Sequence, residues 1–199
     1  MIPGLEKAWD MLQDMGPDDV CRRAQASFDG ATRRFTLRSF GMDIHVSPAD
    51  RAITSDDGRA EVLLKRLSYF SGLSVLWYLV SAREIPLSGR VVQPSNLKGG
   101  DVFFRGTHVL PLEQLAERYG RDVDGFIARA KGWGGEERQY GDAAFMLYPL
   151  PRIPVALIMW REDEEFPARA DLLFDSSCAS HVPLDILWSI AMMSILIHM

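Results

Sequence analysis

Apolar residues recur along this chain with two different spacings, and these spacings predict its helices and strands. Residues 3–15 and 60–82 repeat apolar side chains every three or four positions, which is the spacing of one helical face. The second half of residues 60–82 is apolar on every side, so this helix is expected in the centre of the fold. Residues 183–199 predict a further apolar helix, with Pro183 in its first turn.

Shorter helical patterns lie between these segments. One helix is expected to start behind Asp18 or Asp19 and to run to about position 27. Two more helices are predicted at residues 111–119 and 122–131. Glycines that follow each of these two patterns mark the helix ends.

Alternating apolar and polar residues indicate strands near both ends of the chain. Residues 33–40 alternate in this way, and residues 44–46 form a short partner strand after a turn at positions 41–43. Residues 49–59 are polar and are expected to form a loop.

Three late strands are predicted at residues 143–148, 153–160 and 168–174, and their short connections favour an antiparallel meander. Early and late strands with helices between and after them are typical of an α+β fold. We therefore expect an antiparallel sheet, formed by the early hairpin and the late three-strand meander, packed against a central buried helix and a C-terminal helix.

Length and composition agree with one globular domain over residues 1–199, with residues 1–16 as an N-terminal helical appendage. The chain is 47% hydrophobic and 25% charged. Its net charge of -5 argues against nucleic acid, because binding to phosphates requires a basic surface. The same charge argues against docking on anionic lipid.

Targeting and redox features are sparse. Cys21 and Cys178 lie far apart and form no CxxC or Cys/His cluster, so neither a disulfide framework nor a cysteine-bound metal is expected. The apolar stretches 70–82 and 186–199 hold 13 and 14 residues, fewer than the about 20 that cross a bilayer. Since no signal-peptide pattern opens the sequence, we expect a cytoplasmic protein without a membrane span.

Four segments together resemble one protein family. They read FTLRSFGMDIHVSP, IPLSGRVVQPSNLKGGDVFF, LAERYGRD and LPRIPVALIMWREDEEFPARADLLFDSSCASHVPLDIL. The chain is similar in these segments, over about residues 20–195, to the DUF3786 family, an uncharacterised family of anaerobic bacteria and archaea. The last segment is the most specific of the four.

The resemblance implies a setting rather than a reaction. Some relatives join this domain to a four-cysteine iron–sulfur segment like that of corrinoid iron–sulfur proteins, and this chain lacks that segment. Family association alone thus implies a corrinoid, a haem or a metal as cofactor, and a redox or corrinoid protein as partner. The family supplies no catalytic residue to carry over.

Four consecutive acidic residues at positions 162–165 follow the strand that ends at Trp160. Their carboxylates are suited to a hard cation or to general acid–base catalysis. The alternative is a solvated hairpin turn, whose charges protect the flanking apolar strands from aggregation. Arg152, Arg161 and Arg169 are candidate partners for these charges.

A second group of chemically active residues occupies positions 175–181. It contains Asp175, Cys178 and His181, which invites a hydrolase interpretation. No GxSxG motif is present, and the spacing does not force a nucleophile against a base. The favoured interpretation is a strand-to-helix turn in which Asp175 and the serines satisfy free backbone amides. As the wall of a pocket, the turn is also a candidate ligand site.

The sequence holds no HxxxH or HExxH pair, so no helix is expected to display two imidazoles for zinc, and a metal site formed by distant residues stays an alternative. His108, in a loop, is a candidate axial ligand for a haem or corrinoid, with polar surface as the commoner alternative.

Three functions follow as hypotheses. The first is an accessory domain of anaerobic metabolism, without catalytic activity, that binds a small molecule or cofactor near Arg152, Trp160, Asp163, Asp175 and His181. The second is a metal-dependent enzyme that uses Asp163, Glu164 and Glu165. The third is a protein interaction module, in which residues 3–15 and 183–199 contact a second copy or another protein.

Overall fold

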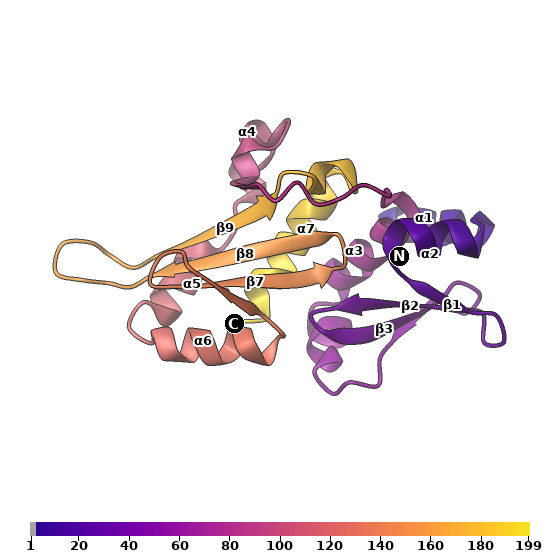
Figure 1. Ribbon diagram of the computed structural model, residues 1–199, viewed down its shortest axis with the longest axis horizontal. Coiled ribbons are helices and arrows are strands. Elements are labelled where there is room, and N and C mark those ends of the chain that lie inside the picture. Colours follow the sequence, from indigo (N-terminus) through magenta and orange to yellow (C-terminus); the bar gives the residue numbers. More distant parts are fainter. Residues whose placement is uncertain (1–2) are drawn as a thin grey trace.

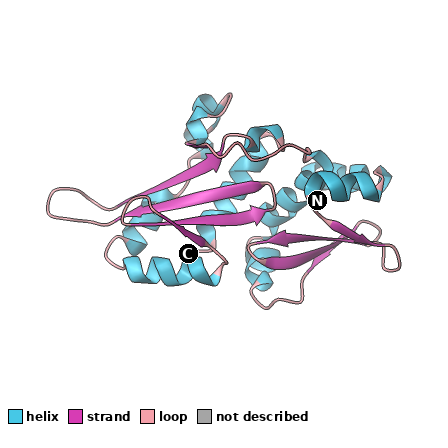
Figure 2. Cartoon of the chain, in the orientation of Figure 1, coloured by secondary structure: helices cyan, strands magenta, loops and turns pink. Residues whose placement is uncertain are grey.

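The structure, a computed structural model, describes residues 3–199 and has the expected α+β class (Figures 1 and 2). Its strands form a four-stranded and a five-stranded antiparallel sheet within these residues. The early hairpin and the late meander therefore belong to two separate sheets.

Two helices open the fold. Helix α1 spans Pro3–Asp14 and buries Ala8, Trp9 and Leu12. Helix α2 spans Pro17–Ala24 and starts before the predicted position, because Pro17 sits in the first turn of a helix, where its missing N–H costs nothing. It ends at Gln25, which has a left-handed φ of 51°.

The first sheet consists of β1 (Ser27–Asp29), β2 (Arg34–Ser39), β3 (Met42–Ser47) and β4 (Ala52–Thr54), in that order. The predicted hairpin is present, but its turn lies at Phe40 and Gly41, not at positions 41–43. Both turn residues have positive φ, 47° and 74°, which matches the twist of a two-residue hairpin turn. The prediction of a loop at 49–59 was wrong for β4, which is too short to show alternation.

The predicted helix at 60–82 consists of two parts. A wide π-helical turn, Val62–Arg66, is closed by a hydrogen bond of 2.9 Å from Leu67 N to Val62 O. Helix α3, Ser68–Ser81, then runs through the centre of the molecule and carries no charged residue. An irregular segment leads from α3 to β5, Val91–Val92.

Short helices follow β5 and precede the remaining strands of its sheet. They are α4 (Gly100–Phe103), α5 (Leu112–Tyr119) and α6 (Val123–Gly132), with 3₁₀ turns at Pro94–Asn96 and Gly106–His108. Helix α6 is capped by Asp122, whose carboxylate accepts a hydrogen bond of 2.9 Å from Gly125 N.

The second sheet has the order β5-β9-β8-β7-β6 and contains the predicted meander. Its strands after β5 are β6 (Glu136–Arg138), β7 (Ala143–Leu150), β8 (Ile153–Trp160) and β9 (Arg169–Asp175). Strand β8 is central and is buried along its whole length except Trp160. Helix α7, Leu184–Leu196, crosses behind this sheet in Figure 1.

The two sheets meet at the β2–β3 turn. Phe40 N donates a hydrogen bond of 2.8 Å to Tyr148 O of β7, and the Phe40 ring packs edge-on against Trp133. Gly134, with a φ of 71°, lies against the Phe40 carbonyl, where a Cβ would come within 3.4 Å. One hydrophobic core consequently contains residues of both sheets and of α1.

Candidate functional site

The residues singled out by the sequence lie at opposite ends of β9. Trp160 and the acidic residues 162–165 lie before its first residue, and Asp175 and His181 lie at or beyond its last. Arg152 precedes β8, so the antiparallel pairing places it at the Asp175 end. A seven-residue strand is about 23 Å long, so the structure does not bring the two groups together.

The acidic turn is closed by its own atoms. Asp163 Oδ1 accepts hydrogen bonds from the backbone N–H groups of Glu165 (2.9 Å) and Phe166 (2.8 Å). Asp163 N in turn donates to Phe166 O at 3.0 Å. Glu164 and Glu165 are exposed. The turn is therefore a side-chain-stabilised loop with its carboxylates in solvent.

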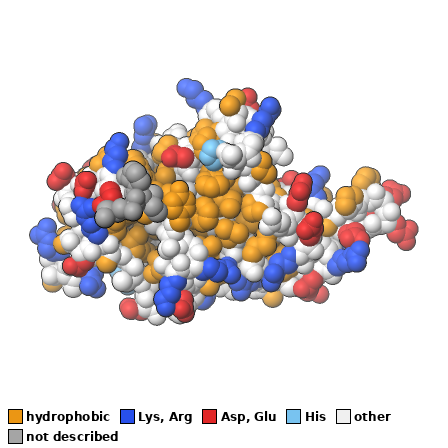
Figure 3. Space-filling view, turned by 180° about the vertical axis from the view of Figure 1, so that it is seen from behind, with side chains coloured by type: hydrophobic (Ala, Val, Ile, Leu, Met, Phe, Trp, Pro, Cys, Tyr) orange, Lys and Arg blue, Asp and Glu red, His pale blue; other side chains and the backbone are white. Residues whose placement is uncertain are grey.

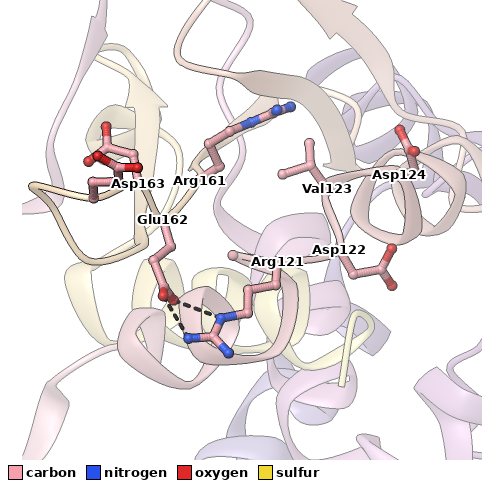
Figure 4. Close-up of a pocket in the computed structure, with 9 residues that line it drawn as sticks. Arg121, Asp122, Val123, Asp124, Arg161, Glu162 and Asp163 are labelled. Carbon is pink, nitrogen blue, oxygen red and sulfur yellow. Dashed lines mark hydrogen bonds and ion pairs between the residues drawn. The ribbon is translucent and has the colours of Figure 1, made fainter.

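An open groove of about 710 Å³ separates this turn from the α5–α6 connection (Figure 4). Its lining comprises residues 120–124 and 161–164, so it includes Asp163 and Glu164 but neither Trp160 nor Glu165. The Arg121 guanidinium donates two hydrogen bonds, 2.7 and 3.1 Å long, to the Glu162 carboxylate. The hydrogen bond from Arg121 lowers the pKa of Glu162.

Most polar groups of the groove are already engaged within the chain. Arg161 N donates to Asp142 at 2.8 Å, and the Asp122 carboxylate caps α6. Among the described lining residues, the carboxylates of Asp124 and Glu164 have no hydrogen-bond or ion-pair partner. Residues 3–199 contain no group of three His, Cys, Asp or Glu side chains arranged for a metal ion.

Trp160 belongs to a separate surface cluster. The Arg169 guanidinium lies 4.8 Å from the centre of its ring, and its Nε1 donates to Asp171 at 2.9 Å. Arg169 also pairs with Asp171 at 3.1 Å. The three side chains satisfy one another across β8 and β9.

Asp175, at the other end of β9, is 3% exposed and binds backbone. Its Oδ1 accepts from the N–H and hydroxyl of Ser88 (3.0 and 2.9 Å) and of Ser177 (2.9 and 2.6 Å), and its Oδ2 accepts from Gly89 N at 2.8 Å. Burial acts to raise the pKa of Asp175, but the hydrogen bonds from Ser177 and Ser88 outweigh it and lower the pKa to about 2.

His181 and Arg152 bind the same stretch of backbone. His181 is 1% exposed, and its Nδ1 accepts a hydrogen bond of 3.2 Å from Arg83 N. Burial, together with the charges of Arg152 and Arg83, lowers the pKa of His181 to about 4. Arg152 donates to Ile85 O at 3.1 Å and to Arg23 O at 2.7 Å.

Three predicted site residues therefore hold one segment, residues 83–90, which we call the strap. The expected role of Asp175 in satisfying amides is present, but most of these amides come from the strap rather than from its own turn. The Ser177 hydroxyl donates to Asp175, and His181 Nδ1 accepts from an amide, so this turn forms no pair of nucleophile and base. Cys178 is fully buried, which raises the pKa of its thiol.

A third region lies on helix α7, within the residues 183–199 that the interaction-module hypothesis named as a contact without predicting which side is exposed. Most residues of α7 are buried, yet every fourth residue along one side is only half-buried. Tyr69, which is 45% exposed, and Phe70 of α3 lie at its edge, and the Phe70 ring is 5.6 Å from Trp188. We call this surface the α7 face; it consists of Tyr69, Phe70, Leu184, Trp188, Met192 and Leu196.

Figure 3 shows hydrophobic side chains gathered in a continuous patch on this side of the molecule. His108 borders it, stacked on Phe103 at 4.2 Å and edge-on to Trp188 at 5.3 Å. The signal in the sequence was an α7 that is apolar all round. Such a helix has more apolar surface than one sheet can cover, but the pattern does not tell which side stays open.

Comparison with known proteins identifies a family and no activity. The model of a family described as "Domain of unknown function (DUF3786)" matches residues 16–196, so α1 lies outside the matched region. No curated protein and no solved structure matches the chain. Among the described residues, none of the helices has the length and apolar character needed to cross a membrane.

Proposed function

We propose that this chain, which belongs to the DUF3786 family, is a protein interaction module whose α7 face binds an apolar helix of another polypeptide. One observation carries the proposal: the outer side of α7 presents a stripe of large apolar side chains where a surface helix normally presents charge.

The composition of the two helices supports this role. Helix α3 has no charged residue, and Asp185 is the one charged residue of α7. The stripe Leu184, Trp188, Met192 and Leu196 follows an i, i+4 spacing, so the four side chains form one ridge. A contiguous exposed apolar patch with a polar rim is typical of a surface that binds protein.

The residue types of the α7 face suit binding. Tryptophan is enriched among the residues that dominate interface energies, and the flexible methionine side chain adapts to a partner's shape. Apolar area removed from water contributes about 25 cal/mol per Å². The rims formed by Arg66 and Asp185 add polar groups that orient a partner.

Site-specific photo-cross-linking in cells tests the proposal. A photoreactive amino acid at Met192 should give one discrete adduct, identified by mass spectrometry, and the same group at exposed Asp124 on the groove should not. A Trp188→Ser change should remove the adduct at Met192 without unfolding the protein. Equal or absent adducts at the two positions would refute the interaction role.

The groove of Figure 4 supports a second candidate, the binding of a small molecule or cofactor in an anaerobic setting. Its volume of about 710 Å³ suits a small ligand, and the carboxylates of Asp124 and Glu164 are available to it. A visible spectrum and elemental analysis of protein purified without oxygen test this candidate. A colourless, metal-free sample whose groove resonances do not shift with added ligands argues against it.

A further inference from the structure

We infer that the polypeptide bound by the α7 face is a second copy of this chain, with the two α7 helices antiparallel. The inference rests on the proposed function and names its partner. It follows from two features of α7, the order of its apolar residues and the placement of charge at its two ends.

The apolar ridge is self-complementary when its direction is reversed. Leu184 and Leu196 are its end residues, and Trp188 and Met192 lie between them. A two-fold axis near position 190 places each leucine beside the opposite leucine of the second copy, and each tryptophan beside a methionine. Every contact then occurs twice, as in the isologous interfaces of most dimers.

The charges at the two ends of α7 specify the antiparallel direction. Asp185 lies in the first turn of α7, on the exposed side, and has no ion-pair partner among the described residues. Arg66 lies at the other end, where its Nη2 donates a hydrogen bond of 2.7 Å to Leu196 O. Eleven helical residues span about 16 Å, so these charges do not pair within one chain.

Antiparallel packing brings Asp185 of each copy beside Arg66 of the other, and it forms this pair twice. Parallel packing instead places Asp185 beside Asp185 and Arg66 beside Arg66, which is repulsive at both ends. Electrostatic complementarity of this kind fixes the register and orientation of an interface. The neighbouring Lys65 and Glu61 form an ion pair of 2.8 Å within one chain, so they do not alter the preference for antiparallel packing.

Sedimentation equilibrium combined with charge exchange tests the pairing. The wild-type chain should sediment at twice its 22.4 kDa mass. Asp185→Arg and Arg66→Glu should each weaken the dimer about tenfold, since two pairs become repulsive. The double variant should regain the wild-type constant to within about threefold, because the reversed charges attract across the interface.

Matched controls separate this effect from a loss of folding. Arg66→Gln removes the guanidinium, which donates to Leu196 O, without reversing the charge at this position. Thermal unfolding measures the stability of each variant. A defect caused by local unfolding lowers the melting temperature and is not restored by the second substitution. A double variant that does not regain the wild-type dimer affinity would overturn the proposed pairing.

Cysteine cross-linking tests the direction. In a Cys21→Ser background, Leu184→Cys and Leu196→Cys chains should be joined by a short bismaleimide after mixing, and neither should cross-link alone. Self-linking of each variant alone would indicate parallel helices and refute the inference.

The outcomes for self-association and for the general interaction role are distinguishable. A monomer in sedimentation, with a photo-adduct at Met192 that contains a different protein, refutes the second copy as partner and leaves the interaction module in place. A monomer without any adduct at Met192 refutes both.

Discussion

The two ends of β9 carry similar residue types and use them in opposite ways. At the acidic turn, carboxylates stand in solvent and are satisfied by a few local amides or by an exposed arginine. At the far end, one buried carboxylate accepts five hydrogen bonds, most of them from a segment more than 80 positions away. The density of acidic residues is thus a poor guide to their importance.

Burial explains the difference. An exposed ion pair contributes little to the stability of the fold, because water already solvates both charges in the unfolded chain. A buried carboxylate without partners is very unfavourable, so the fold that buries Asp175 must supply donors for it. Each donor supplied by the strap becomes a fixed point of the fold. The comparison predicts that substitutions at the two ends differ strongly in their effect on stability.

The largest effect is expected for Asp175→Ala. The change leaves the amides of Ser88, Gly89 and Ser177 without acceptors in a buried place, and the free energy of unfolding should fall by about 4 kcal/mol. Urea unfolding measures this loss. Asp163→Ala, at the acidic turn, is the matched control and should cost much less. Equal losses at both positions would contradict the comparison.

Arg152→Met should come next. It keeps the aliphatic stem but removes donors from three carbonyl groups, at Arg22, Arg23 and Ile85. The expected loss is about 2 kcal/mol, accompanied by faster proteolysis near Leu87, which is 44% exposed. Arg161→Met, whose guanidinium lies on the surface, should leave the proteolysis rate unchanged. A strap with wild-type protection in Arg152→Met would contradict the anchoring role.

The pH dependence of stability should show the buried histidines first and Asp175 second. The pKa values of His181 and His198 are lowered to about 4 in the folded chain, so between pH 6.5 and 4 the unfolded chain binds more protons. Stability therefore falls over this range, by about 3 kcal/mol per histidine. It falls again between about pH 4 and 2, where the Asp175 pKa is depressed.

Substitution of His181 by Gln checks this assignment. The first decline should become shallower in the variant, while the second, caused by Asp175, should keep its slope. Guanidinium unfolding at closely spaced pH values provides the measurement. A variant whose decline matches the wild type above pH 4 would show that His181 does not carry the effect.

The smallest effect is expected for Glu162→Gln. The change breaks the two hydrogen-bonded contacts with Arg121, but both side chains lie on the surface, where salt and water screen the pair. The melting temperature should stay within experimental error of the wild type. A clear decrease would show that the acidic turn stabilises the fold, and would remove the contrast between the two ends of β9.

Local pattern was sufficient for the regular parts of the fold. The late meander and the long helices were predicted because their periods persist over many residues. Strands β1, β4 and β6 have three residues each, too few for alternation to appear. The irregular joint at Leu67 also leaves no signal, because its neighbours keep the apolar spacing of a helix.

The partners of the site residues were beyond the sequence for a different reason. Asp175 was correctly expected to bind amides, but its serine and glycine partners at positions 88 and 89 are brought to it by tertiary structure. The open side of α7 is likewise decided by which side the sheet covers. Both depend on packing between distant elements, which no local spacing encodes.

The strap also constrains the order in which the newly synthesised chain acquires its structure. The backbone amides of Ser88 and Gly89 donate to the carboxylate of Asp175, which lies 87 and 86 positions further along the chain. A ribosome must add nearly half of the protein before this anchor exists, since domains fold as their segments emerge. In the nascent chain the strap is consequently not anchored, and Leu87 is exposed. Chaperones and proteases can therefore bind this segment until β9 has been synthesised.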